Sequence, residues 1–154
     1  MNFPALPTRA VYLRLSNAAK RNALSLRILR DLRSQLHHLN TSSDGRLLLL
    51  PPFKPQILSS LEQNEEEHAW LVNASVWRKE REGLPNVIVL RSEGPVFSSG
   101  HDLTELRSLS HDEVNETFAI CAEVMALIRR SPALVVCPIQ GLLQIFNKFH
   151  PLQE

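Results

Sequence analysis

The sequence predicts an α/β fold, because short apolar runs typical of strands alternate with longer stretches that have helical periodicity. Residues 87–90 are four apolar residues, mostly β-branched, as in a strand that is covered on both faces. Residues 11–15 alternate in the manner of a half-buried strand. Apolar residues recur at helical spacing over residues 26–39 and again over residues 111–130. This alternation of strands and helices is typical of the α/β class.

The size and composition of the chain fit one ordinary folded core. Its 154 residues are 44% hydrophobic and 21% charged, which does not indicate disorder. A formal net charge of +1 supplies no basic surface for nucleic acid, and no apolar run approaches the roughly 20 residues of a membrane span. We therefore expect neither a nucleic-acid partner nor a membrane span.

The sequence contains no pattern of metal ligands. Cys121 and Cys137 lack the spacing of a zinc site or a redox pair, which favours buried, unreactive thiols in a reducing compartment. The histidines have no partners at ligand spacing, and no nucleophile triad is present. Residues 1–9 lack the apolar segment of a signal peptide and are too short for a transit peptide. We therefore predict no metal site and no targeting segment.

The first helix is predicted by a stripe of leucines that follows a polar loop. Ser25 is a suitable N-cap for this helix, and arginines follow on the opposite, solvated side. The stripe consists of Leu26, Leu29, Leu32, Leu36 and Leu39. We therefore expect an amphipathic helix that begins directly after Ser25.

Residues 37–86 have an uneven composition and are predicted to be an insertion that is partly disordered. Pro51 and Pro55 interrupt regular structure within them. A helix is expected at residues 57–67, and residues 69–81 either form one more helix or remain flexible. A long irregular connection of this kind is unusual inside a compact domain, which supports the interpretation as an insertion.

Residues 111–130 and 134–139 are predicted to form an amphipathic helix and a further strand. The expected core face of the helix consists of Val114, Phe118, Cys121, Val124, Met125 and Ile128. Pro138 cannot donate a ladder hydrogen bond, which favours an edge strand or the end of a strand.

A polar turn follows the strand predicted at residues 87–90. The Ser-Ser-Gly triplet at 98–100 can adopt conformations that bulkier residues resist. Asp102, followed by Glu105, begins a helix with negative charge where the helix dipole favours it. Backbone amides exposed at such a turn can stabilise a developing oxyanion, so this turn is the candidate functional site.

Two blocks of sequence resemble the signature motifs of a known superfamily. The segment Phe97-Ser-Ser-Gly-His-Asp-Leu103 resembles the F-[SA]-[SA]-G-x-D-[LI] signature of the crotonase superfamily, the enoyl-CoA hydratases and isomerases that stabilise acyl-CoA enolate anions. Residues 13–26 resemble the superfamily's N-terminal strand, its N-x-x-x-x-N-A-L loop and the start of its first helix. The block Lys20-Arg-Asn-Ala-Leu-Ser-Leu26, together with a histidine after the signature glycine, is similar to the mitochondrial enoyl-CoA hydratase domain-containing protein 3 subfamily.

The resemblance implies a partial crotonase-like ββα spiral that is truncated at the C-terminus and carries an irregular insertion. Residues 1–36 would be the N-terminal part of the crotonase-like domain and residues 37–86 the insertion. Residues 87–141 would form the core with the oxyanion-hole motif, and residues 142–154 a divergent tail. Members of the superfamily are longer, so the chain would cover little more than their N-terminal half, and a mitochondrial location is implied.

The resemblance assigns the site mainly to backbone groups. The amide N–H of His101 would be one of two donors to a thioester carbonyl, which requires an aimed amide and not an imidazole. A general base on the His101 side chain is the alternative. Asp102 is interpreted as a stabiliser of the helix start rather than as an acid catalyst, and Arg21 has an exposed loop cation as its alternative interpretation. The residues expected to contact coenzyme A are Arg21, Ala23, Leu24, Ser99, Gly100, His101, Asp102, Leu103 and Thr104.

The resemblance also implies that part of the catalytic machinery is absent. A glycine-rich stretch normally supplies the second oxyanion donor, whereas here Gly141 is followed by bulky residues that include Ile145 and Phe146. The loss of one such donor typically costs about 100-fold to 1000-fold in rate. The carboxylates with which relatives transfer protons would lie beyond Glu154.

Two functions are therefore predicted. The first is an acyl-CoA hydratase/isomerase-type protein of fatty acid metabolism that binds a coenzyme A thioester as substrate, has no prosthetic group and is inactive in this truncated form. The alternative is a non-catalytic fragment or isoform that acts at most as a weak coenzyme A or partner-binding module. Full-length relatives are homotrimers, and this chain is not expected to assemble normally, because sheet edges and apolar helix faces would stay exposed.

Overall fold

A small parallel sheet lies at the centre of the fold. The computed structural model describes residues 3–63, 65 and 68–139. The strands in these ranges are β1 (Ala10–Leu15), β2 (Val87–Ser92) and β3 (Leu134–Val136). β2 is the middle strand and pairs in parallel with both neighbours, so that Val87 lies beside Ala10 on one side and beside Leu134 on the other.

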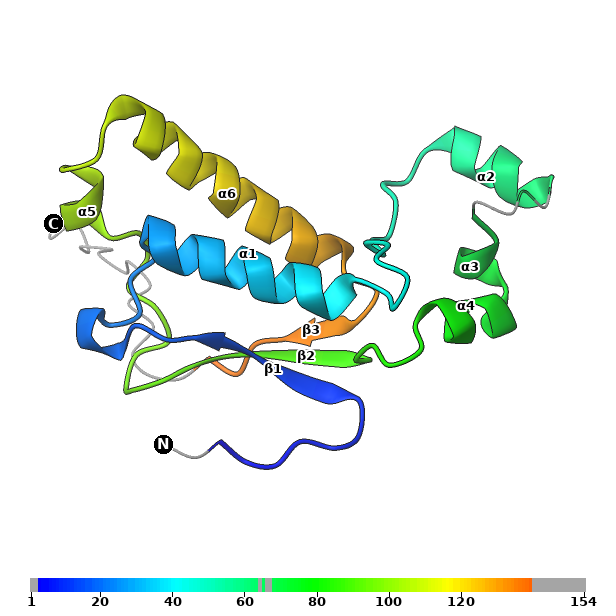
Figure 1. Ribbon diagram of the computed structural model, residues 1–154, viewed down its shortest axis with the longest axis horizontal. Helices are drawn as coiled ribbons and strands as arrows, with labels where there is room; N and C mark the ends of the chain where they lie inside the picture. Colours follow the sequence, from blue (N-terminus) through cyan, green and yellow to red (C-terminus); the bar gives the residue numbers. More distant parts are fainter. Residues whose placement is uncertain (1–2, 64, 66–67, 140–154) are drawn as a thin grey trace, which may run out of the picture.

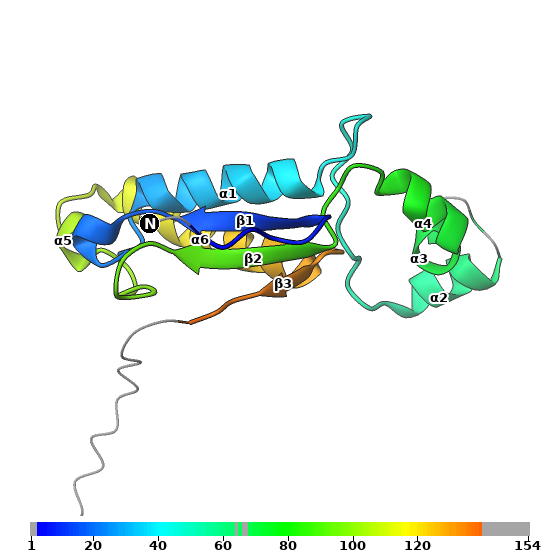
Figure 2. The same ribbon diagram turned by 90° about the horizontal axis from the view of Figure 1, so that it is seen from below.

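Helices connect the strands and cover one face of the sheet. The helical elements in chain order are η1 (Ala18–Lys20), a 3-10 helix, then α1 (Leu26–Asn40), α2 (Pro55–Glu62), α3 (Ala69–Val72), α4 (Ala74–Glu80), α5 (Leu103–Leu106) and α6 (His111–Arg130). α1 and α6 lie side by side on the sheet, whereas α2, α3 and α4 project beyond one end of it (Figures 1 and 2). This arrangement confirms the predicted α/β class. None of the helices in the described ranges is both long and apolar enough to span a membrane.

α1 forms as predicted, including its N-cap. The side chain of Ser25 accepts a hydrogen bond from the N–H of Ile28 at 3.3 Å. The leucine stripe faces the sheet, where Leu29 and Leu36 are buried in one cluster with Leu13 and Ile88. Burial of such a stripe, rather than helix propensity alone, stabilises a helix of this length in a protein.

α6 has the predicted bounds, and its predicted core face is confirmed only in part, because Val124 is buried and Cys121 and Ile128 pack against the core. Its N-terminus is a capping box, in which the Ser110 side chain accepts from the Glu113 N–H and the Glu113 side chain accepts from the Ser110 N–H. Phe118 and Met125 are 52% and 61% exposed, so the predicted core face is wrong for these two residues. The buried residues of the helix are Thr117, Ile120, Val124 and Leu127. The two sets share Val124 and both have helical spacing, and contact with α1 determines which neighbouring residues are buried, which periodicity alone cannot do.

β2 is covered by helices on one face only, which corrects the prediction of burial on both. Ile88 is fully buried, whereas Val87 and Val89 on the other face are half-buried. On that second face the Phe3 ring packs on the guanidinium group of Arg91, 4.9 Å from its centroid. An N-terminal segment therefore gives this face a partial cover in place of a second helical layer.

β3 is an edge strand and ends before Pro138, as the proline predicts. It is shorter than the predicted strand at 134–139. The predicted burial of the thiols is wrong, because Cys121 is half-buried and Cys137, in the segment after β3, is exposed. Neither cysteine forms a disulfide.

The segment between α1 and β2 starts later than expected, and its first helix ends earlier than expected. α1 continues to Asn40, past residue 37, where the insertion was expected to begin. The helix expected at residues 57–67 is observed as α2, which ends at Glu62. Pro55 is its first residue, a position where the missing N–H of proline costs no helical hydrogen bond.

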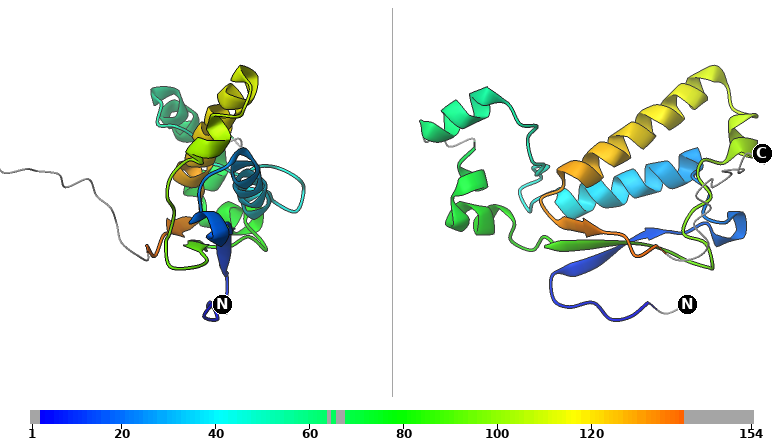
Figure 3. Two further views of the ribbon diagram at one scale, coloured as in Figure 1. Left: turned by 90° about the vertical axis from the view of Figure 1, so that its left-hand side faces the viewer. Right: turned by 180° about the vertical axis from the view of Figure 1, so that it is seen from behind.

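Residues 69–81 form two short helices instead of one. The break lies at Asn73, whose side chain accepts hydrogen bonds from the N–H groups of Ser75 and Val76 and thereby caps α4. The rear view in Figure 3 shows α2, α3 and α4 set apart from α1 and α6. The sequence left the state of these residues open, and the structure resolves it as helical.

Candidate functional site

The two blocks that carry the family resemblance meet beyond the carboxyl ends of β1 and β2. The chain that leaves β1 forms η1 and a loop up to Leu24, and the chain that leaves β2 turns at residues 93–100 and enters α5. Figure 1 shows α5 at the end of the sheet opposite to α2, α3 and α4. Parallel strands bring their carboxyl ends to one edge, which is why segments so distant in sequence come together there.

Backbone hydrogen bonds join the two segments. The N–H of Leu24 donates to the carbonyl of Gly100 at 2.8 Å, and the N–H of Asp102 donates to the carbonyl of Leu24 at 3.1 Å. These bonds form a parallel bridge between Leu24 and His101. In this bridge His101 lies between the two residues that bond to Leu24, so its own N–H points away from the segment of Leu24. The N–H of His101 accordingly forms no hydrogen bond with any described residue.

Asn22 organises the loop, a role that the sequence analysis did not assign. Its side chain is almost fully buried, and its Nδ2 donates to the carbonyls of Glu93 at 2.7 Å and Val96 at 2.8 Å. Its Oδ1 accepts from the N–H of Asn17 at 2.9 Å. The backbone of Asn22 has φ 54°, a left-handed conformation that asparagine tolerates better than most residues. The N-x-x-x-x-N motif of the sequence could have indicated this role, because its two asparagines are the hydrogen-bonded residues Asn17 and Asn22.

A cavity of about 320 Å³ lies between the loop and the turn. Its lining residues are Lys20, Ala23, Ser99, His101, Asp102, Leu103 and Thr104. All of these except Lys20 are predicted coenzyme A contacts. The other predicted contacts are Arg21, Leu24 and Gly100, which are bonded next to the lining: the carbonyl of Arg21 accepts from the N–H of Ser99 at 3.0 Å, and Leu24 binds Gly100 as described. The structure thus brings the predicted residues together and adds a cation.

An ion pair connects Lys20 to Asp102 in the wall of the cavity. Nζ of Lys20 lies 2.7 Å from Oδ2 of Asp102, which is 7% exposed, and Oδ1 of Asp102 accepts from the N–H of Glu105 at 3.1 Å. The hydrogen bond from Lys20, followed by that from Glu105, holds the pKa of Asp102 below its usual value. Both oxygens of this ionised carboxylate are engaged, which favours the helix-start role over acid catalysis.

The imidazole of His101 packs against α6 and not against a polar partner. Its ring centroid lies 5.3 Å from that of Phe118, at an interplanar angle of 40°. Its Nε2 is buried and has no hydrogen-bond partner in the described part of the chain. A general base needs a hydrogen-bonding route to the proton that it takes, so this packing favours the backbone amide over the ring as the functional group.

The described part of the chain holds few other groups for catalysis. No cluster of three or more histidine, cysteine or carboxylate side chains suited to a metal ion occurs there. Asp102 is the one carboxylate among the residues that line the cavity in that part. Gly141, Ile145 and Phe146, on which the prediction about the second oxyanion donor depends, lie outside the described residues.

Comparison with known proteins identifies similar sequences. The chain is 35% identical over 129 residues to the mitochondrial enoyl-CoA hydratase domain-containing protein 3 of Rattus norvegicus and 33% identical over 129 residues to that of Homo sapiens. Each alignment covers 83% of this chain but only 30% and 29% of the respective relative. The chain thus spans about 30% of the length of these curated relatives. No family model matches the sequence.

Solved structures show the same fold. Human enoyl-CoA hydratase domain-containing protein 3 superposes with a TM-score of 0.55 at 28% identity, covering 89% of this chain and 39% of that chain. An enoyl-CoA hydratase from Bacillus anthracis superposes with a TM-score of 0.56 at 19% identity, covering 86% of this chain and 36% of that chain, a likeness of fold alone. With both signature blocks joined at one site and with these likenesses of sequence and fold, the chain belongs to the crotonase superfamily of enoyl-CoA hydratases and isomerases.

Proposed function

We propose that this chain binds an acyl-CoA thioester at the cavity between η1 and α5, with the thioester carbonyl at the amide of His101. The observation that carries the proposal is the N–H of His101, which has no hydrogen-bond partner in the described part of the chain and belongs to a residue that lines the cavity. A donor that is already positioned stabilises negative charge on a thioester oxygen without reorganisation of the site.

The remaining contacts with coenzyme A would come from the two segments that the backbone bridge joins. One wall would consist of Ser99, Gly100, His101, Asp102, Leu103 and Thr104, and the other of Arg21, Ala23 and Leu24. Lys20 adds an exposed ammonium group at the same cavity, close enough to attract the phosphates of the ligand. The relatives are named mitochondrial proteins, and we infer the same location for this chain.

For the reaction, two candidates follow from the same site. The first is hydratase or isomerase chemistry of the kind that the relatives' names state. This chemistry needs a group that transfers a proton at the acyl chain. Among the described residues of the cavity, Asp102 is the carboxylate present, and it is ionised, paired with Lys20 and bonded to the N–H of Glu105. This engagement favours the second candidate, a module that binds coenzyme A or a partner without turnover.

The proposal is tested by removing the amide hydrogen while keeping the rest of the residue's backbone. The wild-type chain is expected to bind crotonyl-CoA more tightly than coenzyme A, because only the thioester has a carbonyl for the N–H of His101. His101→Pro lacks this N–H and is expected to bind crotonyl-CoA about tenfold more weakly, with the preference over coenzyme A lost. His101→Ala keeps the N–H and is the matched control, expected to bind like the wild type.

Isothermal titration calorimetry with both ligands gives these affinities, and the melting temperature of each variant without ligand reports on its fold. Equal affinity of the wild-type chain for crotonyl-CoA and coenzyme A would contradict the carbonyl contact. A separate assay of crotonyl-CoA hydration decides between the two candidates. A rate well above that in buffer would establish turnover and exclude the non-catalytic module.

A further inference from the structure

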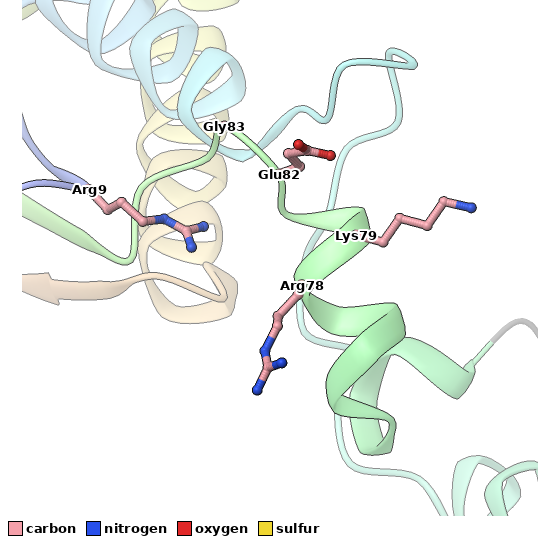
Figure 4. A pocket seen from close by; sticks show the side chains of 5 residues that line it. All are labelled: Arg9, Arg78, Lys79, Glu82 and Gly83. Atoms are coloured by element: carbon pink, nitrogen blue, oxygen red, sulfur yellow. The ribbon is translucent and has the colours of Figure 1, made fainter.

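A second cavity lies at the end of the sheet opposite to His101. It has a volume of about 520 Å³ and is lined by Arg9, Arg78, Lys79, Glu82 and Gly83. Arg9 directly precedes β1, whereas the other residues belong to the end of α4 and the turn after it. Figure 4 shows the guanidinium groups of Arg9 and Arg78 on two sides of the hollow, while the side chains of Lys79 and Glu82 project away from it.

Arg9 is held in place before any ligand binds. Its Nη2 donates to the carbonyls of Arg81 and Leu84, both at 3.0 Å. The backbone of Arg9 has φ 67°, a left-handed conformation that a residue of this kind keeps only where its surroundings impose it. No hydrogen bond from Nη1 or Nε reaches a described residue. The guanidinium group is therefore fixed in position and retains unused donors.

The positive charge around this cavity has little compensation. Within the described ranges, no ion pair is formed by Arg9, Arg78, Lys79 or Arg81. The nearby carboxylate of Glu80 is paired with Arg46, which leaves Glu82 as the one carboxylate of the described cavity lining. Several cations around one acidic group produce a positive potential that an anion relieves.

Arg81 adds a buried charge behind the wall of the cavity. It is 3% exposed, and its guanidinium group donates to the carbonyls of Pro132 and Pro85 and packs on the Trp77 ring, 4.9 Å from the centroid. Burial, and then the charge of Arg9, lower the pKa of Arg81. Two guanidinium groups thus repel each other at this point with no carboxylate ion-paired to either in the described structure.

We propose that this cavity binds a small phosphate-bearing anion between the guanidinium groups of Arg9 and Arg78. The planar fork of arginine matches two phosphate oxygens, and charge-assisted hydrogen bonds of this kind are among the stronger ones. The hollow, of about 520 Å³, is large enough to admit such an anion. β1 lies between this cavity and the His101 site, and its six residues extend roughly 20 Å at about 3.3 Å per residue, so we expect the two sites to bind independently.

Inorganic pyrophosphate is the probe, and the full chain is titrated with it by calorimetry. The wild-type chain is expected to bind pyrophosphate in a saturable manner and more tightly than citrate, which carries carboxylates in place of phosphates. Arg78→Gln is expected to weaken the binding about tenfold or more, because it removes one side of the clamp. Arg78→Lys keeps the charge without the fork and should lie between the two.

Arg27→Gln is the matched control, since Arg27 is an exposed arginine on α1 that faces neither cavity. It removes the same charge and should leave pyrophosphate binding unchanged within about twofold. An equal loss in Arg27→Gln and Arg78→Gln would overturn the proposal in favour of general charge attraction. Absence of saturable binding, citrate binding as tight as that of pyrophosphate, or competition by saturating crotonyl-CoA would overturn it as well.

Discussion

The chain contains two regions that are stabilised in different ways. The body consists of β1, β2 and β3 with α1 and α6, and the arm consists of α2, α3 and α4. Every residue of the main buried cluster lies in the body or directly next to its elements, and none lies in the arm. Within the arm, α3 and α4 instead contact each other, as in the stack of Trp70 on Trp77, whose ring centroids lie 5.4 Å apart. A hydrophobic pattern therefore specifies the body, and local contacts specify the arm.

Polar contacts connect the C-terminal end of the arm to the body. Arg81, just after α4, donates to the carbonyl of Pro132 next to β3, and Glu80 pairs with Arg46 in the loop after α1. The pair of Glu80 with Arg46, whose side chain is 50% exposed, adds little to stability, and the single hydrogen bond from Arg81 adds less than the burial of a whole leucine stripe. The comparison thus leads us to expect an arm that opens at a lower cost in free energy than the body.

The largest expected effect is the loss of a buried leucine in the body. Leu36→Ala removes a fully buried side chain of α1 and should lower the free energy of unfolding by about 2–5 kcal/mol. Leu58→Ala removes a side chain of α2 that is 47% exposed and should cost less than about 1 kcal/mol. Urea unfolding followed by circular dichroism measures both values.

The two substitutions delete the same atoms from a helix, so each is the control for the other. Helix propensity changes equally in both, and only burial differs. Similar losses of stability in the two variants would show that the arm is as tightly packed as the body, and the distinction between the regions would fail.

The fold of the body could be predicted because a local sequence pattern indicates each of its main elements. Ser25 precedes the leucine stripe of α1, and the apolar run that starts at Val87 reads as a strand. The exposure of Phe118 could not be predicted, because two neighbouring stripes of α6 have the same period and only packing on α1 chooses between them. The break between α3 and α4 at Asn73 was missed for a related reason. An asparagine within a helical pattern is recognised as the N-cap of a second helix only when the preceding helix is known to end there.

The sequence predicted which residues belong to the candidate site, but not the side-chain contacts that join them. The motif around Gly100 drew attention to the amide of His101, because a glycine turn before a helix exposes backbone donors. The contacts of Lys20 with Asp102 and of Asn22 with Glu93 join segments that are distant in sequence. A single sequence carries no information on such pairs beyond residue type, so these roles required the structure.

An intermediate effect is expected from the helix caps of the two regions. Ser110→Ala breaks the capping box of α6 and should lower the global free energy of unfolding by about 1 kcal/mol, because α6 is part of the body. Asn73→Ala removes the cap of α4 and should leave global unfolding nearly unchanged while amide exchange rises within residues 74–80. Hydrogen exchange measured by mass spectrometry, with Ser110→Thr as the variant that retains a cap, distinguishes the two. If both alanine variants lowered the global free energy of unfolding equally, the arm and the body would unfold as one cooperative unit.

The smallest effect concerns the ion pair at the site end of the body. Lys20 and then the N–H of Glu105 hold the pKa of Asp102 below its usual value of about 3.9, so the unfolded chain binds more protons than the folded chain in the pH range between the two values. The stabilisation is therefore present above the usual pKa and is lost as the pH falls through the lowered pKa. Asp102→Asn should lack this part of the acid dependence when urea midpoints are compared at successive pH values below about 5. Added salt should reduce the difference in urea midpoint between the two proteins, because Lys20 is 60% exposed and its attraction to Asp102 is screened. If the urea midpoints of Asp102→Asn and wild type change in parallel with pH at low salt, the ion pair contributes nothing to stability.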